Sequence, residues 1–147
     1  MREALIEAQI AFDKGEVPIG AVIADKNAQI LARAHNLVET LQDVTAHAEI
    51  LALRDASRYI QNWRLESLSL YVTLEPCVMC SSALMLSRLD KIYYGCKDSR
   101  LGSLTTNINI CDNPKLPHQI MMTGGVLAEE CKNILQKFFK LLRQKSK

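Results

Sequence analysis

Two short motifs, a His-x-Glu and a Pro-Cys-x-x-Cys, constrain this chain more than any other feature of its sequence. His47 and Glu49 stand in the segment TAHAEI, and Cys77 and Cys80 follow in LEPCVMC. Two cysteines three residues apart face the same way on a helix, and a first helical turn stabilises their thiolates. Side chains in a first turn also lean toward the N-terminus and can converge beyond the helix end. The sequence therefore predicts two helix N-termini that meet at one point.

Together these residues indicate an open zinc site. His47, Cys77 and Cys80 offer one nitrogen and two sulfur ligands, a set that suits zinc. A closed structural site would need a fourth protein ligand, for which the candidates are Cys96, Cys111 and Cys131. None of these has a paired spacing, and three ligands leave a position for water. Zinc lowers the pKa of such a water to about 7, and an adjacent carboxylate can take its proton. We therefore expect one Zn²⁺ per chain, with Glu49 as the proton shuttle.

Length and composition favour one folded domain in a reducing compartment. The 147 residues are 48% hydrophobic and 23% charged, which are ordinary values for a globular protein. Five cysteines are an odd number, and with no signal-like segment they favour metal chemistry over a disulfide framework. No apolar run is long enough to span a bilayer. We expect a single zinc-dependent domain over 1–147, located in the cytoplasm and not in a membrane.

Hydrophobic periodicity predicts an α/β fold. An amphipathic helix should end at Gly15, and a hairpin of strands 17–25 and 29–34 should follow. Thr45 is a plausible N-cap for the next helix, and Pro76 suits the first helical turn after a strand at 68–75. Further elements are expected as strands at 91–95 and 118–124 and as a last helix from Leu127. This order predicts a three-layer α/β/α domain with a mixed, mostly five-stranded sheet and a parallel crossover from 68 to 95.

The C-terminal segment is basic. From Lys132 onward the chain has six lysine or arginine residues and no acidic one, although the net charge of the whole chain is only +2. The basic residues are Lys132, Lys137, Lys140, Arg143, Lys145 and Lys147. Such a tract often contacts polyanions, and a solvated helix face is the alternative. Phe138 falls on the apolar stripe of this helix, so Phe139 should be the exposed phenylalanine.

The paired motifs resemble the signature of the zinc nucleoside and nucleobase deaminases, His-x-Glu followed by Pro-Cys-x-x-Cys. Other segments extend the resemblance over nearly the whole chain and point to one branch, the bacterial tRNA-specific adenosine deaminases. These segments are GEVPIGAVI, TAHAEILALR, LYVTLEPCVMC, SRLDKIYYGCKD and GGVLAEECKNILQKFF. The resemblance implies a cytidine deaminase-like fold and the conversion of adenosine to inosine at the wobble position of a tRNA anticodon. It also implies a homodimer.

The resemblance further implies roles for single residues. His47, Cys77 and Cys80 would bind zinc, and Glu49 would move protons while a zinc-activated water attacks C6 of a flipped-out adenine. Asn36 matches an asparagine that hydrogen-bonds the flipped nucleotide, and a simple turn residue is the alternative. The other candidate substrate contacts are the backbone amide of Ala48, the pocket residues Ile19 and Pro76, and the anticodon-loop contacts His118 and Phe139. For Ala48, Ile19 and Pro76, ordinary packing is the alternative.

Two other functions share parts of this pattern. A deaminase of guanine, cytosine or cytidine would have the same core motif but little use for a basic, phenylalanine-bearing tail. A non-catalytic zinc module that binds RNA would need a fourth protein ligand and would have no use for Glu49.

Overall fold

A mixed five-stranded sheet forms the middle layer of the molecule, as predicted. The computed structural model describes residues 1–145. The strands are β1 (Gly20–Ala24), β2 (Ile30–His35), β3 (Ser69–Leu74), β4 (Lys91–Cys96) and β5 (Met121–Thr123). They lie in the order β2-β1-β3-β4-β5, with β1 antiparallel to both neighbours and β3, β4 and β5 parallel. The predicted hairpin and parallel crossover are both present, while β5 is shorter than the predicted 118–124 strand.

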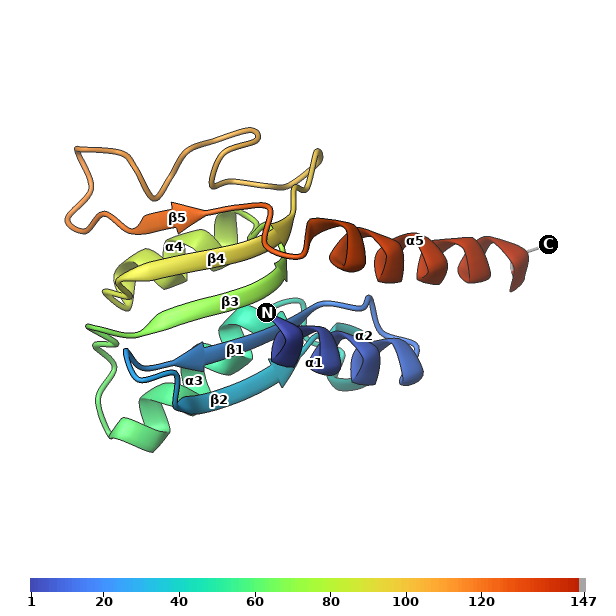
Figure 1. The fold of residues 1–147 in the computed structure, drawn as a ribbon, viewed down its shortest axis with the longest axis horizontal. Helices are drawn as coiled ribbons and strands as arrows, with labels where there is room; N and C mark the ends of the chain where they lie inside the picture. The colour runs from blue at the N-terminus through green and yellow to red at the C-terminus, as the bar shows by residue number, and fades with distance from the viewer. Residues whose placement is uncertain (146–147) are drawn as a thin grey trace.

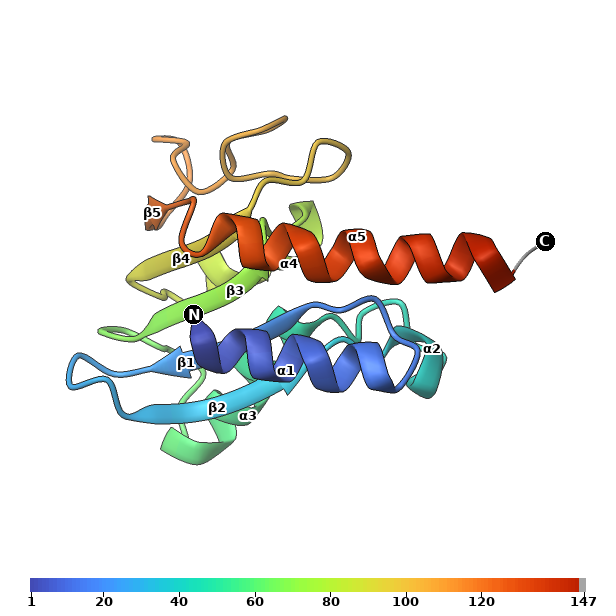
Figure 2. The same cartoon turned by 45° about the vertical axis from the view of Figure 1, so that its right-hand side comes forward.

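Helices cover both faces of this sheet, which completes the predicted three layers (Figures 1 and 2). The helices are α1 (Arg2–Asp13), α2 (Val38–Leu41), α3 (Ala48–Ile60), α4 (Val78–Leu86) and α5 (Ala128–Lys145). α1 and α5 lie side by side on one face, and α3 and α4 lie on the other. The short helix α2 has no amphipathic repeat and was not predicted. None of the helices in residues 1–145 is long and apolar enough to cross a membrane.

The end of α1 is set by Gly15, as predicted. This residue has φ +78°, a left-handed conformation that glycine adopts without strain. The amide of Gly15 donates to the carbonyl of Phe12, and that of Glu16 donates to the carbonyl of Ala11. These two bonds form a Schellman motif, which satisfies the last carbonyls of the helix. The motif fixes the position of Glu16 relative to α1.

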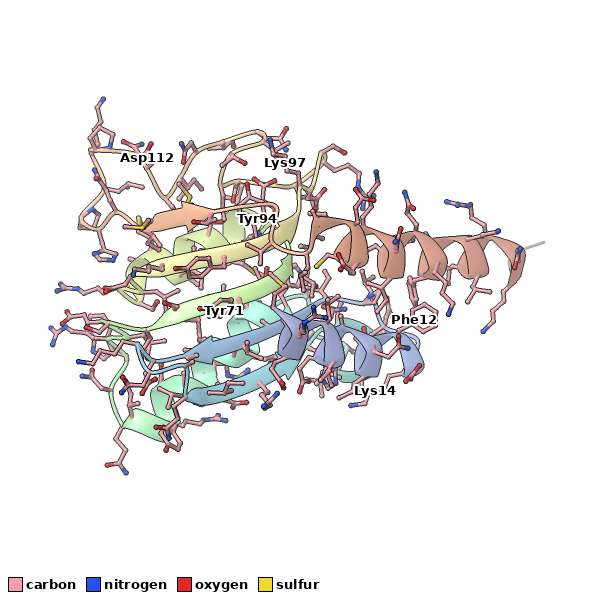
Figure 3. The ribbon with its side chains drawn as sticks, in the orientation of Figure 1. Phe12, Lys14, Tyr71, Tyr94, Lys97 and Asp112 are labelled. Carbon is pink, nitrogen blue, oxygen red and sulfur yellow. The ribbon has the colours of Figure 1, made fainter. Side chains whose placement is uncertain are left out.

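One edge of the sheet collects the loops that matter for function. β3 and β4 are parallel, so their carboxyl ends lie at the same edge, where β2 also ends and β1 begins. Figure 3 labels Lys97 just beyond β4, and Phe12 and Lys14 near the end of α1, all toward this edge. The second half of α5 extends past the sheet on the same side (Figure 1). Residues far apart in the sequence are thereby brought together.

Candidate metal centre and active site

His47 and Glu49 lie at the start of α3. His47 is the N-cap residue, with an extended backbone at φ −73° and ψ 150°, and Glu49 lies in the first turn. The prediction that Thr45 would be the N-cap is wrong. Its amide and its hydroxyl both donate to Oδ1 of Asp43, at 2.8 and 2.7 Å, so Thr45 belongs to the preceding turn. The helix starts later than predicted, and this start places His47 at its tip.

Cys77 and Cys80 lie at the start of α4 in the same way. Cys77 is the N-cap residue, and Cys80 follows in the first turn. The prediction that Pro76 would occupy the first helical turn is wrong, because it precedes the N-cap. The Pro76 carbonyl instead accepts hydrogen bonds from the Ser103 amide and hydroxyl, at 3.0 and 3.1 Å. These bonds tie the loop after β4 to the start of α4.

The two helix starts bring three metal-binding atoms together. Nδ1 of His47 lies 3.7 Å from Sγ of Cys77 and 3.4 Å from Sγ of Cys80. The three atoms all lie within 4.8 Å of one another. A tetrahedral zinc with ordinary Zn–N and Zn–S bonds requires an N···S separation of about 3.6 Å. The donor set and its spacing therefore fit zinc.

The charges of this cluster favour metal binding. Hydrogen bonding from Cys80, and then from His47, lowers the pKa of the Cys77 thiol to about 4. The same interaction with Cys77, together with burial, raises the pKa of Cys80. The Cys77 hydrogen bond likewise raises the pKa of His47. One thiolate is thus ready as a ligand, and metal binding would release the remaining protons.

Glu49 is buried beside these donors. Only 4% of the residue is exposed, and its Oε2 atom has no hydrogen-bond partner within the described residues. Burial raises the pKa of its carboxyl group to about 7. A carboxyl group with a pKa near neutrality can both accept and donate a proton during a reaction. Its position and its chemistry therefore suit the predicted proton shuttle.

The other three cysteines lie elsewhere. Each thiol donates to a backbone carbonyl: Cys96 to Thr73, Cys111 to Ser81 and Cys131 to Val126. Burial raises the pKa of Cys111 to about 11 and that of Cys131 to about 12. Among residues 1–145, only His47, Cys77 and Cys80 form a group that could hold a metal ion. The cluster has the three ligands expected of an open site, and none of these cysteines supplies a fourth.

A cavity of about 470 Å³ opens above the cluster. His47, Glu49 and Cys77 line it, together with three of the predicted substrate contacts: Ile19, Asn36 and Phe139. Ala48 and Pro76 are buried next to the cluster and do not line the cavity. His118 lies outside it, where its Nε2 contacts the Leu89 carbonyl at 2.9 Å. The roles of all these residues in substrate binding stay predictions.

Two buried carboxylates in the cavity wall were missed by sequence reasoning. Glu16 is 1% exposed and Glu75 is 2% exposed. Glu75 accepts hydrogen bonds from the amides of Asp98, Leu104, Thr105 and Thr106 and from both threonine hydroxyl groups. It therefore holds the loop after β4, whose residues 97–101 form one side of the cavity. Glu75 directly precedes Pro76, and Glu16 lies two residues before Pro18, but nothing in the sequence marks either acid as buried.

A second, basic hollow adjoins the cavity. It has a volume of about 810 Å³ and shares Lys97, Arg100 and Phe139 with the cavity. Its other basic residues come from α5: Lys132, Lys140 and Arg143. None of the acidic residues within 1–145 lines it. A phosphate-bearing ligand could therefore extend from the metal cluster along α5.

The three-layer fold, the His-Cys-Cys cluster and the neighbouring glutamate define a deaminase of the zinc-dependent class. Comparisons with known proteins agree. Residues 1–143 match the family model of the MafB19-like deaminases. A solved structure from a study of A-to-I editing by tRNA:A34 deaminases at the wobble position has a TM-score of 0.88 and 38% identity, covering 92% of this chain and 97% of that one.

Two relatives of known name show to which group of deaminases the chain belongs. The tRNA-specific adenosine deaminase of Bacillus subtilis (strain 168) is 48% identical over 147 residues, covering 100% of this chain and 91% of the relative. That of Aquifex aeolicus (strain VF5) is 48% identical over 143 residues, covering 97% and 93%. The chain therefore belongs to the MafB19-like deaminases and, among these, to the family of the tRNA-specific adenosine deaminases.

A more distantly related protein of the same fold acts on a different substrate. The structure of guanine deaminase from Bacillus subtilis has a TM-score of 0.63 and 27% identity, covering 97% of this chain and 90% of that one. The shared architecture thus serves a free base in one protein and a tRNA in others. The surroundings of the metal cluster, and not the shared fold, therefore determine which substrate is bound.

Proposed function

We propose that this protein hydrolyses the wobble adenosine of a tRNA anticodon to inosine, with one zinc ion per chain and in the cytoplasm. The proposal rests on one observation, that a metal-binding cavity and a basic hollow adjoin each other. A metal-binding cluster with a buried glutamate lies at the floor of the cavity, and a basic hollow continues from that cavity along α5. A free base or nucleoside has no phosphates to occupy this hollow, whereas an anticodon loop has several.

The zinc ion would be held by His47, Cys77 and Cys80, and when bound it makes a water nucleophilic at neutral pH. Glu49 takes the proton of the attacking water, whose oxygen forms a bond to C6 of the adenine. The same carboxyl group gives this proton to the ring nitrogen, then takes the second proton of the added water from the oxygen on C6 and delivers it to the exocyclic amine. The C6–N6 bond then breaks, and adenosine and water have become inosine and ammonia. The cavity walls keep bulk water away from Glu49, which is 4% exposed.

The RNA would be held outside the catalytic cavity by two kinds of contact. Lys132, Lys140 and Arg143 offer positive charges for phosphates. Phe139 is half-buried and lines both hollows, so its ring offers a face on which an unpaired base can stack. Phe138 faces the interior, is 8% exposed and packs edge-on against Phe12 at 5.7 Å between centroids. This difference agrees with the expectation that Phe139 is the accessible ring.

The proposal is tested by supplying competing substrates. The zinc-loaded protein is incubated with total tRNA and, separately, with adenosine, guanine, cytosine and cytidine. Inosine in the digested tRNA and ammonia release are then measured. We expect inosine at the wobble position and no turnover of the small compounds. Turnover of guanine or of a pyrimidine without any change in the tRNA would favour the small-substrate deaminase.

We also propose that the protein forms a homodimer, as the family resemblance implies. α4 carries two exposed apolar side chains, Val78 (44%) at its start next to Cys77 and Leu86 (62%) at its end, which an oligomer could cover. Sedimentation at several protein concentrations would test this. A monomer at concentrations that give full activity would contradict it.

A further inference from the structure

A buried carboxylate other than Glu49 faces the catalytic cavity. Glu16 is 1% exposed, and its carboxylate accepts three hydrogen bonds from groups in the cavity wall. Oε2 accepts from Nδ2 of Asn36 at 3.1 Å and from the amide of Glu39 at 3.2 Å. Oε1 accepts from the amide of Thr40 at 2.6 Å. A charged group at such a depth is retained only when its oxygens are satisfied, and here all three partners come from one short segment, residues 36–40.

The carboxylate organises the short helix α2. The N-cap residue of this helix is Leu37, which has no side chain able to cap. The amides of Glu39 and Thr40 are the donors that an N-cap side chain normally takes, and Glu16 accepts both. Val38 and Glu39 of the same helix line the cavity. Glu16 thus holds a helix of one turn in place as part of the cavity wall.

The carboxylate also decides which way the amide of Asn36 points. An ionised carboxylate can only accept hydrogen bonds, so it holds the NH₂ end of the amide toward itself. The backbone of Asn36 is fixed independently, because its amide donates to the carbonyl of Ile19 at 3.0 Å. Burial opposes ionisation of Glu16, but the hydrogen bonds from Thr40 and Glu39 outweigh it and leave the pKa below its ordinary value. The Asn36 side chain, 4% exposed, is therefore presented to the cavity in one orientation.

We propose that Glu16 is a positioning residue for deamination, which acts by orienting the Asn36 amide and by anchoring α2 in the cavity wall. The inference rests on the proposed function, since Asn36 is the predicted contact of the flipped nucleotide. Glutamine at position 16 would present an NH₂ group of its own to the donors around it. The Asn36 amide could then turn over, and one amide of α2 would lose its acceptor.

The test is a double-mutant cycle on kcat/KM for tRNA, with zinc content and Tm measured for every variant. Glu16→Gln should lower kcat/KM by about 10-fold to 100-fold, the usual cost of losing hydrogen bonds to a charged group. In an Asn36→Ala background the same substitution should cost at least about tenfold less, because the side chain it orients is gone. An equal loss in both backgrounds would mean that Glu16 acts only through α2 or the fold, and would overturn its assignment as the residue that positions Asn36.

Glu7→Gln is the matched control. Glu7 is another buried carboxylate, 9% exposed, which contacts Nδ1 of His35 at 2.7 Å and does not line the cavity. Its substitution should leave kcat/KM unchanged. If Glu16→Gln does not fold, Glu16→Asp keeps the charge but shortens the side chain, and its cycle with Asn36→Ala should show the same coupling. A wild-type protein that is inactive on tRNA would refute the proposed function, whereas an active wild type with an uncoupled cycle refutes this inference alone.

Discussion

At the scale of single residues, the site depends on an unfavourable placement that the fold sustains. Glu49 is buried with one oxygen that has no hydrogen-bond partner within residues 1–145, and burial raises the pKa of its carboxyl group. An unpartnered buried polar atom costs roughly 1–3 kcal/mol. Such costs persist where function needs the group and the surrounding structure holds it in place.

Glu49→Ala separates proton transfer from metal binding. Because Glu49 is not one of the three clustered donors, the variant should keep its zinc and its fold. Turnover should fall by a factor of about 100 or more, since general acid–base catalysis is lost. Zinc content by atomic absorption and inosine formation in tRNA measure the two effects. Loss of zinc would show that Glu49 is a metal ligand, and near-normal turnover would show that Glu49 is not the proton shuttle.

Cys77→Ala and Cys80→Ala should give the opposite pattern. Each removes one of three donors, so the protein should lose most of its zinc, and the free energy of metal binding should be lost from stability. We expect a lower Tm than in the zinc-loaded wild type. Cys131→Ala is the control, since this thiol donates to the Val126 carbonyl and is not one of the clustered donors. Full zinc occupancy in either ligand variant would show that the ligands are wrongly assigned.

At the scale of elements, the sequence predicted which segments form helices and strands better than where each helix begins. The five strands and the four longer helices follow from apolar periodicity and from breakers such as Gly15. The starts of α3 and α4 were misplaced because Thr45 and Pro76 are engaged by Asp43 and Ser103, which local propensity does not reveal. α2 depends on the carboxylate of Glu16, more than twenty residues upstream. A helix that is capped by a distant residue has no local signal.

The contribution of Glu16 to this arrangement should depend on pH. Its pKa in the folded protein lies below the ordinary value of 4.5, so the ionised carboxylate stabilises the fold above pH 4.5. This stabilisation is lost as the pH falls through the lowered pKa. Urea unfolding of wild type and Glu16→Gln should therefore differ most near pH 7, and the difference should shrink as the pH falls from 4.5 through the lowered pKa. Glu66→Gln, at an exposed position, is the control. A difference that is the same at every pH would contradict the assigned ionisation.

At the scale of the whole molecule, the topology gathers all parts of the site at one edge of the sheet. The loops after α1, β2, β3 and β4 meet the starts of α3 and α4 there, and α5 reaches the same edge from the other face (Figure 1). The residues of the metal cluster were predictable because their types and spacing are specific to zinc chemistry. The remaining walls come from segments as far apart in the sequence as Glu16 and Phe139, which no local pattern joins.

Substitution of Phe139 tests whether an RNA base stacks on its ring, where the cavity and the basic hollow meet. Phe139→Ala should weaken tRNA binding by roughly 1–3 kcal/mol, the usual value of one base–aromatic stack. Leu141→Ala is the matched control on the same helix, since Leu141 is 41% exposed and lines neither hollow. Filter binding at one salt concentration measures both variants. Equal affinities of wild type and Phe139→Ala for tRNA would show that no base stacks on Phe139.

The end of α5 tests whether the basic hollow holds RNA phosphates. A protein truncated after Leu142 lacks Arg143, which lines the hollow, and Lys145, which follows on the same helix. It also lacks Lys147, which lies outside the described residues. Phosphate contacts release counterions, and each contact contributes about 0.7 to the slope of log K against log salt for a single strand. The truncated protein should therefore bind tRNA more weakly and with a shallower slope, while its zinc content and Tm stay near wild type. The control combines Lys26→Ala and Lys115→Ala, two exposed charges outside both hollows, and should leave the slope unchanged. If the truncation also leaves the slope unchanged, the basic end of α5 does not contact the RNA, and the hollow alone must account for tRNA binding.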